Sequence, residues 1–208
     1  MASLSKEQES YNIYSTDQVR LMAVVKNRAM TDVKSALNKY GIDLIGESRW
    51  QEAKDRIHLY PESIEKHFIG HLQTNKVVDV VAVFDCVETV DSLKLAEKIN
   101  QAAINANKVI SIYIQINISE DNNKYGFTYE ESIRIFPELK KLSNITIDGI
   151  MTITAQQKIA QTRVHFKQMK ELQEKLQVRE LSMGMSTDWK VAIEEGATIV
   201  RVGRDLFE

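Results

Sequence analysis

The sequence has few of the residues that interrupt or cross-link a chain. Its 208 residues include 8 glycines, 2 prolines and 1 cysteine, whereas average usage would give about 15 glycines and about 10 prolines. Because the chain has a single cysteine, Cys86, a disulfide framework within the chain is excluded. We expect Cys86 to be a buried residue that packs in the core rather than a nucleophile. The scarcity of glycine and proline argues against a turn-rich β-sandwich and favours regular elements joined by short loops.

Strong charge and long apolar runs are also absent. The net charge is −2, which provides no basic surface for general nucleic-acid binding. No apolar run approaches the length that crosses a bilayer, and the start of the chain has no apolar segment of the kind that a secretory signal needs. We therefore expect a cytoplasmic protein that binds neither membranes nor nucleic acids.

The remaining composition is typical of a folded globular protein. Apolar residues make up 43% and charged residues 27% of the chain, which excludes disorder as the dominant state. The length allows one or two domains. Because no composition shift or linker divides the chain, we expect a single domain over residues 1–208, in which residues 1–20 form an N-terminal segment before the first strand.

Eight short apolar runs are predicted to be β-strands. The run from Ile110 to Ile118 alternates isoleucine with serine, tyrosine, glutamine and asparagine, which is the period-two pattern of a strand with one aliphatic and one polar face. The eight runs cover residues 21–25, 44–46, 67–70, 83–87, 110–118, 145–153, 180–183 and 198–202.

Helical patterns lie between these runs. Asp91 or Ser92 can cap one helix, and Thr128 with Glu131 forms the capping-box pattern of another. Pro137 is expected to kink or restart that second helix. Regular alternation of strands and helices predicts parallel strands with helical crossovers. Two α/β architectures fit, a closed (β/α)8 TIM barrel and an open doubly wound sheet, and eight strand units favour the barrel.

In both architectures functional residues lie at the carboxyl ends of the strands. Lys26 ends the first run, where a lysine amine could form a Schiff base with an aldehyde. Gly203 follows the last run and would let a ligand approach the backbone closely. Residues 182–188 end the seventh run and open a helix. They supply hydroxyls and amides at the helix start, a frequent phosphate site in such barrels.

Each of these features also has an ordinary structural explanation when it is taken alone. Lys26 could be a solvated lysine after a strand, and the two loops could be ordinary capped turns. In the second loop, Ser186 or Thr187 can cap the last helix, which is expected to end near Gly196. His67 and His71 are separated by a strand-like segment, so we expect His67 to point inward and we predict no metal site.

Seven segments, taken in order along the chain, resemble those of the pyridoxal-phosphate homeostasis protein family, the YggS/PROSC-like proteins. Any one segment is a weak match, but the ordered set is specific and extends over nearly the whole chain. The segments cover residues 21–26, 46–52, 67–76, 115–118, 149–153, 181–186 and 200–207.

The resemblance implies a (β/α)8 barrel like the N-terminal domain of alanine racemase, with pyridoxal 5′-phosphate (PLP) bound as a Schiff base to Lys26. It implies that Ser186, together with the backbone around Gly203 and Arg204, holds the phosphate, and that Arg201 lies at the pyridine nitrogen. The other residues of the predicted PLP site are Ser48, His71, Met151, Ser182 and Met183.

This chain departs from the family pattern at four positions near the predicted site. Val25 and Asn27 stand where the family usually has serine and threonine on either side of the lysine. Ser48 replaces an asparagine, and Arg204 replaces a threonine after the glycine. These departures concern the affinity and geometry of PLP binding rather than the fold.

The family role implied by the resemblance is to store, buffer and deliver PLP without robust catalysis. We expect a monomer whose partners are PLP and apo-enzymes that use it. The alternative is a PLP-dependent amino-acid racemase, which needs acid–base groups on both faces of the substrate. The length leaves no room for the second domain that supplies one of these groups in the resembling racemase. A third hypothesis is a phosphosugar barrel with a Schiff-base lysine. The ordered set of family segments argues against it.

Overall fold

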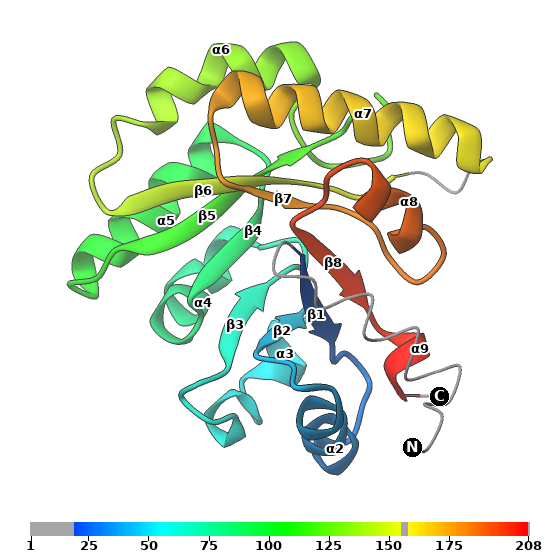
Figure 1. The fold of residues 1–208 in the computed structure, drawn as a ribbon. Helices are drawn as coiled ribbons and strands as arrows, with labels where there is room; N and C mark the ends of the chain where they lie inside the picture. The colour runs from blue at the N-terminus through cyan, green and yellow to red at the C-terminus, as the bar shows by residue number, and fades with distance from the viewer. Residues whose placement is uncertain (1–18, 155–157, 208) are drawn as a thin grey trace.

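The computed structural model describes residues 19–154 and 158–207, so most of the predicted N-terminal segment lies outside the described residues. Eight parallel strands form a closed barrel in the order of the sequence, as Figure 1 shows. The strands are β1 (Arg20–Val24), β2 (Leu44–Glu47), β3 (Glu65–Phe68), β4 (Cys86–Val90), β5 (Ile110–Ile116), β6 (Ile145–Thr152), β7 (Glu180–Ser182) and β8 (Ile199–Val202).

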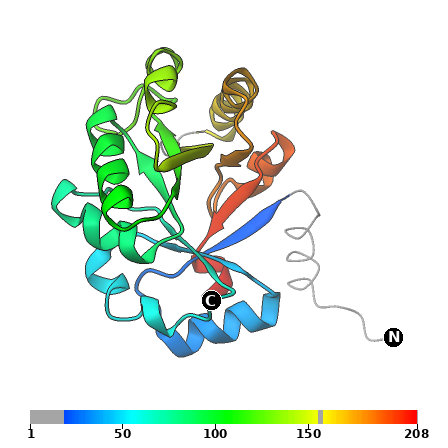
Figure 2. The same ribbon diagram turned by 90° about the vertical axis from the view of Figure 1, so that its left-hand side faces the viewer.

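Helices surround the strands on the outside of the barrel (Figures 1 and 2). None of the helices in the described residues is long and apolar enough to cross a membrane. The helices are α2 (Met30–Tyr40), α3 (Trp50–Ala53), α4 (Val77–Val83), α5 (Leu93–Asn105), α6 (Tyr129–Leu139), α7 (Ile159–Leu176), α8 (Trp189–Glu194) and α9 (Arg204–Phe207), with short 3-10 turns at Ile57–Leu59 and Thr74–Lys76.

Pairing between the first and last strands closes the barrel. Met22 of β1 is in register with Arg201 of β8, and Ala23 is in register with Val202. In Figure 2 these two strands, blue and red, lie side by side. The closed barrel is therefore confirmed over the open doubly wound sheet. The closure also brings Lys26 after β1 next to the loop after β8, although the two segments are far apart in the sequence.

The two faces of each strand contribute to two different cores. In β5 the isoleucines face the helices, where they join the large apolar cluster between sheet and helices. The alternate face, which includes Tyr113, points into the barrel. The polar face that the period-two pattern predicted is thus the interior of the barrel. The apolar part of this interior cluster consists of Met22, Leu44, Cys86, Tyr113, Met151 and Ile199.

The structure corrects the fourth predicted strand. Residues 83–87 were predicted as a strand, but Val83 is the last residue of α4 and the strand is Cys86–Val90. Val77, Val80 and Val81 are buried, which is the i, i+3, i+4 spacing of a helix face. The run of valines is therefore helical, and Cys86 is 1% exposed inside the barrel, as predicted.

The predicted helix starts are confirmed at α5 and α6. The Ser92 hydroxyl accepts a hydrogen bond from the Leu95 amide, and Thr128 and Glu131 form a complete capping box. Helix α6 runs through Pro137 and ends two residues later at Leu139, so the proline does not restart the helix. Proline has no N–H and therefore removes one backbone hydrogen bond of the helix. Because Pro137 lies close to the helix end, this lost bond affects only the last turn.

Candidate functional site

The carboxyl ends of the strands form one rim of the barrel, and Lys26 lies on the turn after β1 at this rim. Its side chain is exposed and makes no hydrogen bond or ion pair with any other residue that the structure describes. The Val25 amide donates to the Gly46 carbonyl of β2 at 3.2 Å. The Lys26 amine is therefore available to a ligand at the mouth of the barrel.

A buried ion pair holds the turn that carries Lys26. The Arg56 guanidinium donates to the carbonyl oxygens of Val25 and Arg28, both at 2.9 Å. Its Nε donates at 2.7 Å to the Glu47 carboxylate, which is fully buried on β2. Because a guanidinium presents its donors in a rigid plane, this arrangement fixes the two carbonyls that bracket Lys26.

Arg201 places a buried positive charge inside the barrel beneath the rim. The side chain is 4% exposed, and it donates from Nη1 to the Ser182 hydroxyl and from Nη2 to the Thr152 carbonyl, both at 2.7 Å. Burial lowers the pKa of Arg201, and nearby Glu88 acts in the opposite direction. Since an arginine remains protonated in proteins, the guanidinium is a fixed cation that can face a ligand.

Gly203 leaves space beside β1 on the loop after β8. A methyl group added at Gly203 would lie 3.5 Å from the side chain and the carbonyl oxygen of Val24, which is ordinary van der Waals contact. The free protein thus tolerates a methyl group here, and the glycine leaves the backbone accessible from the rim. Arg204 follows as the first residue of α9, and its side chain is exposed.

Met151, Ser182 and Met183 lie on neighbouring strands but do not share one environment. Met151 is in register with Ser182 across β6 and β7, and both face the interior. The Met183 side chain instead packs in the cluster between sheet and helices, and its amide donates to the Ile199 carbonyl at 3.1 Å. The structure therefore brings Ser182 and Arg201 together and turns the Met183 side chain away.

The turn before α8 differs from the predicted cap. Ser186 and Thr187 precede the helix, but the residue at the cap position is Asp188. Its carboxylate accepts hydrogen bonds from the Met185 amide at 2.7 Å and from the Thr154 hydroxyl at 3.2 Å. These bonds fix the turn and correct the predicted start by one or two residues. Ser186 lies half-buried on this turn, and the predicted stop is confirmed by Gly196, whose φ is +91°.

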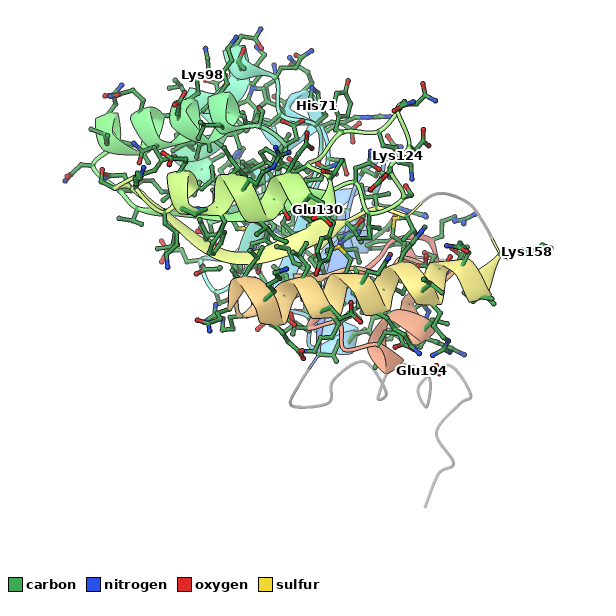
Figure 3. All side chains as sticks on the ribbon, turned by 90° about the horizontal axis from the view of Figure 1, so that it is seen from above. His71, Lys98, Lys124, Glu130, Lys158 and Glu194 are labelled. Carbon is green, nitrogen blue, oxygen red and sulfur yellow. The ribbon has the colours of Figure 1, made fainter. Side chains whose placement is uncertain are left out.

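His71 makes a contact that spans the rim. Its ring stacks on Tyr125 with 3.9 Å between ring centroids, and its Nδ1 lies 3.5 Å from the Asp91 carboxylate. In Figure 3, where His71 and Lys124 are labelled, the loops after β3 and β5 lie side by side. His71 therefore belongs to the rim, as predicted, but its ring is already engaged with two neighbours.

Ser48 lines a cavity of about 250 Å³ between the loops that follow β2 and β3. Three basic side chains, Arg49, His71 and Lys76, and the Trp50 ring also line it. This cavity borders the turn of Lys26, since Arg49 donates to the Asn27 side chain at 3.2 Å. Of the predicted residues, Ser48 and His71 are brought together here rather than with Arg201.

Two residues that the sequence did not single out complete the site. Arg56 holds the turn of Lys26, and Glu88 accepts a hydrogen bond from the Ser182 hydroxyl at 2.7 Å. Glu88 is fully buried. Its only sequence signal is a carboxylate in an otherwise apolar stretch, where a buried charge needs a partner.

Comparisons with known proteins identify the family. The family model for the alanine racemase N-terminal domain matches residues 10–208. A pyridoxal phosphate homeostasis protein of Synechocystis sp. is 40% identical over 198 residues, which cover 91% of this chain and 90% of that protein. A protein of the same name from Escherichia coli is 32% identical over 205 residues, 93% of this chain and 86% of that protein.

The chain belongs to the pyridoxal phosphate homeostasis protein family. This confirms the predicted resemblance. PipY of Synechococcus elongatus, solved without PLP, superposes with a TM-score of 0.89 at 33% identity and covers 99% of this chain and 100% of that chain. PipY with PLP bound gives a TM-score of 0.85 at 32% identity, covering 98% and 99% of the two chains.

The likeness extends in fold alone beyond the pyridoxal phosphate homeostasis protein family. Alanine racemase of Clostridium difficile superposes with a TM-score of 0.77 at 18% identity, and the match covers 96% of this chain and 55% of that chain. The barrel of this homeostasis protein family is therefore the barrel of the alanine racemase N-terminal domain.

Proposed function

We propose that this chain binds PLP as a Schiff base on Lys26 and acts in PLP homeostasis. One observation carries the proposal: an exposed lysine amine without a partner among the described residues and a buried arginine cation lie at the same mouth of the barrel. Relatives named pyridoxal phosphate homeostasis proteins and the PLP-bound structure of PipY support it.

The residues at the rim fit the parts of PLP. A primary amine suits its aldehyde, a fixed cation suits its ring nitrogen, and an accessible backbone with a nearby hydroxyl suits its phosphate. Lys26, Arg201, Gly203 and Ser186 supply these groups. The space at Gly203, where a methyl group would have no contact closer than 3.5 Å, supports the fit independently of the side chains.

PLP supplies an aldehyde that condenses with an amine and a ring that can accept electrons. In our proposal Lys26 holds the aldehyde carbon, and the ion pair of Arg56 and Glu47 holds the backbone of Lys26. Arg201 would place a positive charge next to the ring nitrogen and would so disfavour a proton there. An unprotonated ring is a weak electron sink, which suits a protein that stores the cofactor rather than turning over a substrate.

We also propose that the chain is a single-domain monomer without robust catalysis that delivers PLP to apo-enzymes in the cytoplasm. The relatives are named as homeostasis proteins, which supports the carrier role. An amino-acid racemase is the alternative, and incubation of the PLP-loaded protein with a panel of L-amino acids, followed by chiral chromatography, separates the two. Robust formation of D-amino acids would contradict the carrier role.

Titration with PLP tests the binding proposal. Wild-type protein is expected to develop a visible-range absorbance band that differs from that of free PLP. Lys26→Ala should abolish this band, whereas Lys76→Ala, which removes another lysine at the rim, should retain it. A wild-type protein without the band, or a Lys26→Ala variant with an unchanged band, would refute the proposal.

A further inference from the structure

A chain of hydrogen bonds runs through the barrel interior and ends at Arg201. It is buried from His67 to Arg201, whereas the side chains of Arg20 and Glu65 at its other end are each 39% exposed. Every link is 2.7 Å long, and the side chains come from five strands, β1, β3, β4, β7 and β8. Its members, from the opposite end of the barrel to the rim, are Arg20, Glu65, His67, Glu88, Ser182 and Arg201, and Arg201 also donates to the Thr152 carbonyl.

The chemistry of the donors fixes the direction of the chain. His67 is 1% exposed, and both of its ring nitrogens lie at 2.7 Å from carboxylates, those of Glu65 and Glu88. Burial lowers the pKa of His67, but the hydrogen bonds to these carboxylates outweigh burial and raise the pKa to about 9. The ring is therefore a cation at neutral pH and donates to both carboxylates.

Glu88 in turn controls the Ser182 hydroxyl. One Glu88 oxygen accepts from His67, and the other accepts the single hydroxyl proton of Ser182. Because that proton points to Glu88, a lone pair of the Ser182 oxygen is left for the Arg201 guanidinium. A neutral amide in place of Glu88 could not accept from both donors, and the Ser182 hydroxyl would lose its fixed direction.

We infer that Glu88 is a positioning residue for the cofactor site and that Glu88 acts on bound PLP through Ser182 and Arg201. Glu88 and Ser182 are fully buried, so solvent does not replace a lost partner. This inference rests on the proposed PLP-binding function. It goes beyond that function because it assigns the placement of the ring-nitrogen cation to a carboxylate that lies two hydrogen bonds away from it.

Three variants separate this role from simple support of the barrel. Glu88→Gln removes the charge that directs Ser182, and Ser182→Ala removes the link itself. Glu65→Gln is the matched control, since Glu65 also bonds to His67 but has no contact with Ser182. Thermal unfolding first establishes that each variant is folded. The readouts are the PLP dissociation constant, the position of the visible band and, in unliganded protein, the NMR titration of His67.

We expect Glu88→Gln and Ser182→Ala to weaken PLP binding by about tenfold, the effect of one charged hydrogen bond, and to shift the visible band. Glu65→Gln should leave the PLP dissociation constant within about twofold of the wild-type value, a difference of well under 1 kcal/mol. It should leave the visible band unshifted. In the unliganded protein, the pKa of His67 should fall in Glu88→Gln and in Glu65→Gln and stay unchanged in Ser182→Ala. A residue that only supported the barrel would lower the unfolding temperature without moving the band.

Two results would overturn the inference. One is a Glu88→Gln or Ser182→Ala variant that is folded and binds PLP with the wild-type affinity and band. The other is a Glu65→Gln variant with the same PLP effects as Glu88→Gln. If wild-type protein itself forms no band, the proposed function fails instead. The Arg201 Nε–H resonance of unliganded protein then still tests the chain, because it should move in Glu88→Gln and Ser182→Ala but not in Glu65→Gln.

Discussion

Raising the pH is expected to destabilise the unliganded protein through His67. The folded-state pKa of this buried ring is about 9, above the ordinary value of 6.5, because Glu65 and Glu88 hold its charged form. A raised pKa contributes stability that is fully present below pH 6.5 and is lost as the pH rises through 9. The difference between these two pKa values corresponds to at most about 3 kcal/mol of unfolding free energy.

The pH window isolates this group from its neighbours. The hydrogen bond from His67 is also the main cause that lowers the pKa of Glu65, to about 2, so the two shifts describe one interaction and are not added. Burial raises the pKa values of Cys86 and Tyr113, but those groups act on stability only above about pH 9. Measurements between pH 6.5 and 9 therefore report mainly on His67.

Urea denaturation at several pH values in this window is the assay. Wild-type protein should lose up to about 3 kcal/mol of unfolding free energy between pH 6.5 and 9. His67→Gln should be less stable at pH 6.5 but show a much flatter dependence, since the titrating group is gone. Equal slopes for the two proteins would refute the assignment of His67 as a buried cation.

Three substitutions test other parts of the structure. Gly70→Ala should cost more than about 2 kcal/mol in urea denaturation, because the new methyl carbon would lie 1.8 Å from the Ser48 carbonyl oxygen. Gly203→Ala should change the unfolding free energy by less than about 1 kcal/mol, since its methyl group fits in the free protein, but should weaken PLP binding measured by absorbance titration. Arg56→Lys should slow the appearance of the visible band, because an ammonium lacks the planar fork with which Arg56 reaches both carbonyls and Glu47 at once, while Arg49→Lys should leave the rate near that of wild type.

The architecture of the fold could be predicted from local patterns, whereas the bounds of the fourth strand, the effect of Pro137 and the cap of the last predicted helix could not. Alternation in Ile110–Ile116 and the capping box at Thr128 are local signals, and both are confirmed. The valine-rich stretch before Cys86 has apolar residues at both strand and helix spacings, so its composition does not distinguish a buried helix from a buried strand. Residues 83–87 are predicted as a strand, whereas Val83 is the last residue of the helix Val77–Val83 and the strand begins at Cys86.

From the sequence, the site could be placed at the carboxyl ends of the strands, but the contacts within it could not be predicted. Lys26 and Arg201 follow or end apolar runs, and that position is visible in the sequence. Glu88 and Arg56 could not be predicted as site residues, because their roles depend on partners far away in the chain. Ser182 lies 94 residues after Glu88, and the Val25 carbonyl lies 31 residues before Arg56. No local pattern carries such a pairing, and only closure of the barrel brings the groups together.

Borohydride trapping tests the central claim most directly. Reduction of the PLP-loaded protein should fix the cofactor covalently, and peptide mass analysis should find the added mass on Lys26. The same treatment of Lys26→Ala should leave no comparable modification. Trapping on another lysine of the rim, such as Lys76, or no trapping in wild-type protein, would contradict the assignment of Lys26 as the residue that holds PLP.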